Sequence, residues 1–253
     1  MLSKEEMLKF RKNLGFNIWQ IEIDYLQHLF LFYLSRKTKK DYVFKDGTAL
    51  KKFYGLNRFS IDLDFTSLNG NDEVVEEIAN DISEFGFPAK VHKIKSIKDV
   101  GKSYTLKIQG PLYTGDEKTV AKLKIEISLR KDIILQPDLR EVVPIYPDIN
   151  PYIILVLKPE EILAEKIRTI FSRGRARDVY DLWFLIKKDV KIDIDLINKK
   201  LSCYKLEFSF KNLEKSINTI KDEWFNELKA ITTFVPEFNQ VKREIMIKFR
   251  GHD

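Results

Sequence analysis

The stretches FKDGTAL (residues 44–50) and RFSIDLDF (residues 58–65) decide the fold that this chain is expected to adopt. We interpret them as a strand, a Gly-Thr turn, one helix and a second strand. Because alternate side chains of a strand share a face, Asp62 and Asp64 are predicted to project together. The apolar residues between and beside them are then expected to face a core: Ile61, Leu63 and Phe65. Two carboxylates on one face beside such a turn indicate a seat for divalent metal ions and a nucleoside triphosphate.

Composition limits the class of protein. The chain has 253 residues, 44% of them hydrophobic, which is enough for one large domain or two modest ones. Its 44 basic and 38 acidic residues give a net charge of +6, so a nucleic-acid partner requires the basic surplus to be local; a Lys-rich solvated surface is the alternative. One cysteine, Cys203, excludes a disulfide framework and a cysteine zinc site. No apolar run approaches the roughly 20 residues of a membrane span, so we expect a cytoplasmic protein without a membrane partner.

The order of helical and strand patterns predicts two domains, 1–157 and 158–253. The first is expected to be mixed, with helices at 18–36, 49–54 and 72–85 and strands at 42–45, 58–65, 89–97, 103–109, 119–128 and 153–157. A first helix is expected to begin after Ser3 as its N-cap. The helices at 49–54 and 72–85 are expected to end at Gly55 and Gly86. The proline-rich stretch 137–151 predicts loops and short edge strands. From Pro159 onward the pattern is helical, with a break at Gly174 and a new helix near Ala176.

A third carboxylate is expected from a neighbouring strand. Glu126 is the best candidate, because it alternates with apolar residues at 123, 125, 127 and 129 and so faces the same way as the aspartates. Clustered acids raise one another's pKa, and bound metal would compensate the charge. We therefore predict a two-metal Mg²⁺ site at Asp62, Asp64 and Glu126. The alternative is that these acids are the solvated face of an amphipathic strand.

The Gly-Thr turn favours the site interpretation. Gly47 lets a phosphate approach the backbone closely, and Thr48 offers both its N–H and its hydroxyl. The following helix would direct its N-terminus at the anion. We therefore predict that Gly47 and Thr48 hold the triphosphate.

Two blocks of sequence resemble a known family. The pattern K-x-G-T-A-L-x-x-x-Y-G-x-x-R-x-S-x-D-L-D-F (residues 45–65) resembles the nucleotidyltransferase motif of the AbiEii/AbiGii toxins. These are toxins of type IV toxin–antitoxin systems, within the polymerase-beta-like nucleotidyltransferase superfamily. EKIR (residues 165–168) and RGRARDVYDL (residues 173–182) resemble the downstream helical motif of that family.

The resemblance implies an α+β nucleotidyltransferase fold, a mixed sheet with flanking helices, followed by a helical domain. It implies transfer of NMP from an NTP to an acceptor, with RNA, and tRNA in particular, as the suggested acceptor. A separately encoded antitoxin, without a stable complex, would oppose this toxin. The substrate assignment is an analogy at the level of the family. The motif positions Lys45, Arg58 and Ser60 are implied to bind nucleotide.

One position departs from the family pattern. The family has two glycines before the threonine, whereas this chain has Asp46 in place of the first. A negative charge there would oppose a triphosphate, unless the side chain points away or helps to bind metal.

The second block carries charged residues at helical spacing. Lys166 lies at the edge of an apolar stripe, and Arg177, Asp178 and Asp181 share one flank of the next helix. The resemblance implies that Lys166 contacts a nucleotide phosphate and that Asp178 or Asp181 takes part in the active site. The alternative is an Arg177–Asp181 surface ion pair that contributes little. Basic residues of this block are weaker candidates for binding RNA phosphates: Arg168, Arg175 and Arg177.

Two rival functions remain open from the sequence. A nucleotide-binding module of the same fold without transfer activity would bind NTP and make no product. A plain interaction protein would bind neither metal nor NTP.

Overall fold

The computed structural model describes residues 1–38, 40–71, 73–97 and 100–251. The chain forms two compact units. The first contains Met1–Ala49, Phe59–Lys131 and Pro137–Val156, and the second contains Leu50–Arg58, Asp132–Gln136 and Leu157–Asp253.

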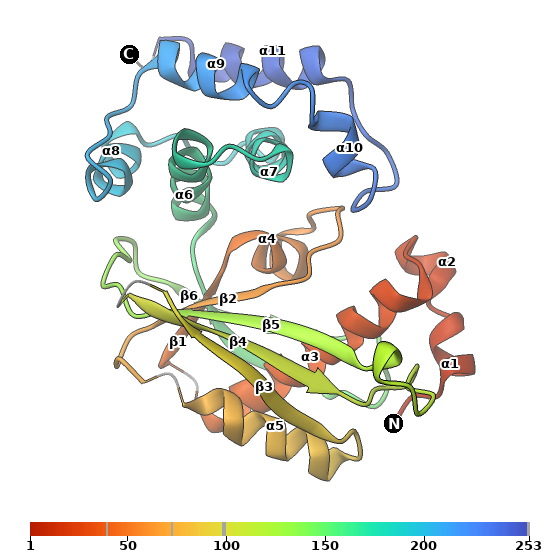
Figure 1. Ribbon diagram of the computed structural model, residues 1–253. Coiled ribbons are helices and arrows are strands. Elements are labelled where there is room, and N and C mark those ends of the chain that lie inside the picture. Colours follow the sequence, from red (N-terminus) through yellow and green to blue (C-terminus); the bar gives the residue numbers. More distant parts are fainter. Residues whose placement is uncertain (39, 72, 98–99, 252–253) are drawn as a thin grey trace. The chain divides into compact units, whose positions relative to one another are not determined.

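A seven-stranded mixed sheet, in the order β3-β4-β5-β2-β1-β7-β6, is the framework of the first unit (Figure 1). Its strands are β1 (Tyr42–Lys45), β2 (Leu63–Ser67), β3 (Ala89–Ser96), β4 (Gly101–Ile108), β5 (Ala121–Ser128), β6 (Asp138–Val142) and β7 (Tyr152–Val156). β1 pairs with β7, and β2 with β5, in parallel, and the other neighbours are antiparallel. The predicted α+β class is confirmed, and so is a short edge strand within the proline-rich stretch 137–151, which is β6.

Strand β2 begins later than the sequence predicted. It starts at Leu63, so Asp62 precedes the strand instead of lying within it. The expected burial of Leu63 and Phe65 is confirmed, but that of Ile61 was wrong, because its side chain is 38% exposed. The reason is that residues 60–62 bond to side chains of other elements and not to a neighbouring strand. Gln27 donates to the carbonyls of Ser60 and Ile61, at 2.9 Å each.

Helices α3 (Ile18–Lys37) and α5 (Val74–Phe85) cover one face of the sheet (Figure 1). Helix α3 is buried on all sides from Gln20 to Leu31, including polar side chains such as Glu22 and Gln27. Helix α5 ends at Gly86, with φ +117°, as predicted, whereas its predicted start at Asp72 lies outside the described residues. The smaller helices of this unit are α1 (Lys4–Leu8), with its predicted Ser3 cap, and α2 (Arg11–Leu14).

The chain turns helical directly after β1, earlier than predicted. Helix α4 (Asp46–Ala49) continues into a π-helical turn, Leu50–Tyr54, and Gly55 follows with φ +82°. Gly47 and Thr48 therefore belong to the first helical turn and not to a separate loop before it.

The second unit is helical. It contains α6 (Pro159–Ser172), α7 (Ala176–Lys187), α8 (Ile194–Ser202), α9 (Phe210–Asn218), α10 (Trp224–Leu228) and α11 (Phe238–Phe249). Pro159 lies in the first turn of α6, and Gly174, with φ +47°, separates α6 from α7, both as predicted. Within the described ranges, no helix is long and apolar enough to cross a membrane.

A buried ion pair holds segment 132–136 in the second unit. Lys200, 2% exposed, contacts Glu161 at 2.6 Å and Glu165 at 3.2 Å. Glu161 also accepts the N–H groups of Ile134 and Leu135 at 2.8 and 2.7 Å. Burial disfavours charge on Lys200, but the adjacent carboxylates outweigh it and raise the pKa of the ammonium group.

Candidate active site

Four acidic residues of the first unit influence one another. Asp64 on β2 is in register with Glu126 on β5, which confirms that the neighbouring strand supplies an acid at this place. Asp46 follows β1, and Asp62 immediately precedes β2. Burial, followed by the negative charges of Asp46, Asp62 and Glu126, raises the pKa of Asp64 well above its ordinary value. The ionised form of Asp64 is therefore disfavoured, first by burial and then by its acidic neighbours.

Two lysines lie among these acids. Lys45 is paired with Asp64 across β1 and β2, and its charge partly offsets the rise in the pKa of Asp64. Lys124 hydrogen-bonds Glu126 and lies 3.8 Å from Asp62. Burial lowers the pKa of Lys124, but its hydrogen bond to Glu126 and the nearby carboxylates raise it by more. The sequence reasoning missed Lys124, although its position two residues before Glu126 on the same strand face was a usable signal.

The three predicted metal ligands lie near one another, but their carboxylates do not converge on a single position. Within the described part of the first unit, Asp62, Asp64 and Glu126 do not bring three carboxylate oxygens within 4.8 Å of one another. Lys124 contacts two of the three, and Asp62 lies outside the strand that was expected to orient it. The donor chemistry nevertheless fits a divalent metal, because hard cations prefer carboxylate oxygens and the group has an excess of negative charge.

The backbone conformation after β1 accounts for Asp46 at the position where the family has a glycine. Its φ of +62° lies in the left-handed region, where glycine is favoured and aspartate is among the few other residues tolerated. Its Oδ1 accepts the Gly47 N–H at 2.7 Å, which stabilises this conformation. The backbone shape that a glycine would give is thus kept, with a negative charge added.

Thr48 holds the segment that carries Asp62. The Thr48 side chain is buried, and its hydroxyl donates to the Asp62 carbonyl at 2.5 Å and lies 2.8 Å from the Ser60 hydroxyl. A hydroxyl has one proton, so Ser60 is the donor in the second contact when Thr48 donates to Asp62. Gln27 anchors the same segment from α3. Gln27 was not identified from the sequence, although a buried amide requires hydrogen-bond partners.

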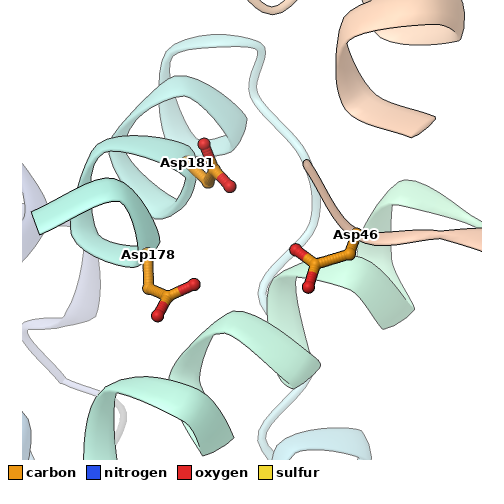
Figure 2. A group of neighbouring side chains, drawn as sticks. All are labelled: Asp46, Asp178 and Asp181. Carbon is orange, nitrogen blue, oxygen red and sulfur yellow. The ribbon is translucent and has the colours of Figure 1, made fainter. Parts of the chain in front are cut away.

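The second unit contains a buried ion network. Asp178 and Asp181, both fully buried, project from successive turns of α7 (Figure 2). Arg58 donates to Asp181 through Nε at 2.6 Å and through a terminal nitrogen at 2.7 Å. Lys166, 3% exposed, lies 2.7 Å from Asp181 and 3.2 Å from Asp178. Arg173 lies 3.6 Å from the other oxygen of Asp178.

This network replaces the surface ion pair considered from the sequence. Asp181 pairs with Arg58 and Lys166 in the interior, so the alternative of an exposed Arg177–Asp181 pair was wrong. The helical spacing was right, but it could not show that α6 and segment 50–58 bury this flank of α7. Roles of Arg58, Lys166, Asp178 and Asp181 toward nucleotide stay predictions. Arg168, a weaker candidate, stacks its guanidinium on Tyr204 at 4.9 Å.

Fold and sequence together define a nucleotidyltransferase. The family described as "Nucleotidyl transferase AbiEii toxin, Type IV TA system" matches residues 29–244, and the chain belongs to this family. Membership implies a nucleotide substrate, a divalent metal and a separately encoded antitoxin. A comparison with curated proteins found no match.

Solved structures share the fold. MenT4, a nucleotidyltransferase toxin from Mycobacterium tuberculosis H37Rv, superimposes with a TM-score of 0.68 at 20% identity, covering 99% of this chain and 89% of its own. JHP933 from Helicobacter pylori gives 0.62 at 22% identity, covering 90% and 89%. A putative nucleotidyltransferase from H. pylori gives 0.64 at 20% identity, covering 92% and 93%.

Proposed function

We propose that this toxin is a Mg²⁺-dependent enzyme that transfers NMP from an NTP to RNA, with tRNA as the favoured acceptor. Family membership supports the type of reaction. The carboxylates around Asp64 support the metal, because a hard divalent cation takes carboxylate oxygens as ligands. The register that sets Asp64 beside Glu126, with Asp62 directly before the same strand, is the observation that carries the proposal.

In this proposal Asp62, Asp64 and Glu126 hold Mg²⁺, which would neutralise the triphosphate and polarise the attacking hydroxyl. The acceptor oxygen forms a bond to the α-phosphorus, the bond from that phosphorus to the β-phosphate breaks, and pyrophosphate leaves. The hydroxyl proton passes to solvent. The hydrogen bonds of Thr48 and Gln27 to residues 60–62 fix the backbone that presents Asp62.

We assign the remaining predicted residues to nucleotide binding. Gly47, Thr48 and Ser60 would lie beside the triphosphate, and Lys45 would add positive charge. Lys166 would contact a nucleotide phosphate, while Asp178 and Asp181 hold its ammonium group and Arg58 fixes Asp181. NTP and RNA are cytoplasmic, and we place the toxin there, opposed by an antitoxin that forms no stable complex with it.

Incubation with each α-labelled NTP, Mg²⁺ and total RNA tests the proposal. We expect the parent chain and a Glu141→Gln control, an exposed acid of β6, to label RNA. Glu126→Gln should not. Absence of RNA labelling by the parent, with NTP binding retained in calorimetry, would favour the rival binding module.

A further inference from the structure

Positive charge is concentrated on three strands of the sheet. Strands β3, β4 and β5 carry seven lysines and one acid, Glu126, and therefore a net charge of +6. The net charge of the entire chain is also +6. Residues 158–253 have a net charge of +4, from 20 basic and 16 acidic residues, and the remaining segments together have −4. The three strands therefore hold the largest positive charge for their length, which would attract a polyanion.

The register places most of these lysines on one face. Lys90, Lys107 and Lys122 form one row across β3, β4 and β5, and Lys93, Thr105 and Lys124 form the next. A third row runs from Lys95 through Ser103 to Glu126. The alternate residues Tyr104, Leu106, Leu123 and Ile125 are buried on the opposite side, where α3 and α5 pack.

Four of the six lysines in these rows are exposed, and we name them the lysine face: Lys90, Lys93, Lys95 and Lys122. The remaining two have other contacts, since Lys107 pairs with Glu117 and Lys124 with Glu126. The third row continues from Glu126 to Asp64 on β2. The lysine face is therefore continuous along the sheet with the proposed metal ligands.

We propose that the lysine face is where the acceptor RNA docks through its phosphate backbone, an inference that rests on the proposed transfer to RNA. Lys122 lies four residues from Glu126 along β5, which is about 13 Å at strand spacing. A ligand that reaches from Lys122 to a metal ion held by Glu126 would therefore be extended, with negative charge that pairs with the lysines along its length. A polynucleotide has these properties, and lysines neutralise its phosphates without reading the bases.

The other side chains of this face favour RNA over a lipid surface. The described open-face residues of the three strands are lysine, serine, threonine and glutamate, without a large apolar side chain to insert into lipid. One exposed imidazole, His92, stands at the bulge of β3, and its charge, like that of Lys90, acts on Glu117. We therefore expect docking with little base preference and a steep dependence on salt.

The test compares two triple variants of the full chain. One is Lys90→Gln/Lys93→Gln/Lys122→Gln, which spares the lysines that contact acids. The matched control is Lys199→Gln/Lys211→Gln/Lys221→Gln, three exposed lysines of the helical unit with the same total charge change. Affinity for labelled total tRNA is measured without NTP over a range of salt concentrations, so that binding is independent of transfer.

We expect the face variant to bind tRNA at least about tenfold more weakly and to lower the salt slope by roughly two, with the control unchanged. NTP affinity should be equal in both. Equal losses in both triples, no loss in the face triple, or binding to phosphatidylserine vesicles but not to tRNA would overturn the proposal.

The same measurements separate the two proposals. If the parent labels RNA but the face triple binds tRNA normally, the docking surface is wrong and the reaction stands. If the parent binds tRNA through this face but labels no RNA, the docking surface stands and the reaction is wrong.

Discussion

Each unit contains a cluster of acidic residues, and the two clusters differ in how many cations contact them. Around Asp178 and Asp181, cations from Arg58, Lys166 and Arg173 lie within 3.6 Å of the carboxylates, and all members except the exposed Arg173 are buried. Around Asp64, burial and then the negative charges of three neighbouring acids raise the pKa of that carboxyl. A neutralised network fixes a fold, whereas an excess of one charge leaves capacity for a ligand. We propose from this difference that the group around Asp178 and Asp181 is structural in the absence of substrate and that the group around Asp64 binds a cation.

The largest expected effect comes from breaking the neutralised network. Arg58→Ala leaves the buried Asp181 without its bidentate partner, and we expect the free energy of unfolding to fall by about 3–5 kcal/mol. Denaturant unfolding followed by circular dichroism measures this loss.

Arg175→Ala provides the matched control. Arg175 is exposed at the start of α7, and its removal should change stability by less than about 0.5 kcal/mol. Equal stability of the two variants would contradict a structural role for the Arg58–Asp181 pair.

The opposite result is expected at the carboxylate group. Asp64→Asn removes one of several like charges, so the protein should be as stable as the parent or more so. Loss of a metal ligand removes several kcal/mol of transition-state stabilisation, and transfer should fall roughly 10²- to 10³-fold. Thermal unfolding and the labelling assay on one preparation give both numbers. A variant that is strongly destabilised but active would reverse the assignment of the two groups.

The sequence predicted this contrast only in part. Alternation on β5 identified Glu126, but only the pairing of β5 with β2 places it beside Asp64, and strand pairing is a long-range property. Asp62 was expected inside β2 because its neighbours alternate, yet hydrogen bonds from Thr48 and Gln27 hold its segment outside the ladder. Local patterns do not contain such tertiary contacts.

The helical unit shows the same limit. Helix ends at Pro159 and Gly174 followed from local chemistry and were predicted. The burial of Asp181 was not, because a polar flank at helical spacing ordinarily faces solvent. Its partner Arg58 lies 123 residues away in the sequence.

Glu22 is a buried acid that belongs to neither of the two acidic groups, so it shows the effect of burial alone. Burial raises its pKa to about 7, against 4.5 ordinarily, although its hydrogen bond from the Leu112 N–H opposes the rise. Between these two values the folded chain binds more protons than the unfolded chain, so stability falls as pH increases. We expect a loss of about 2 kcal/mol from pH 4.5 to 7.5 through this group.

Glu22→Gln tests this expectation, because glutamine still accepts the Leu112 N–H but does not ionise. Its free energy of unfolding should exceed that of the parent at pH 7.5 and equal it near pH 4.5. Glu76→Gln, an exposed position on α5, should follow the parent throughout. Parallel pH profiles for all three chains would show that Glu22 is ionised at no cost.

The smallest effect is expected at Asp46, where shape and charge can be separated. Asp46→Asn keeps a side chain that tolerates φ +62° and can still accept the Gly47 N–H, but it removes one negative charge. If that charge opposes the triphosphate, KM for NTP should fall roughly threefold, a modest change because the site is partly solvated and screened. Asp46→Ala removes the same charge but destabilises the turn by about 1 kcal/mol. Asp222→Asn is the surface control. An unchanged or higher KM in Asp46→Asn would instead show that Asp46 helps to hold the metal, and the proposed ligand set would then include Asp46 beside Asp62, Asp64 and Glu126.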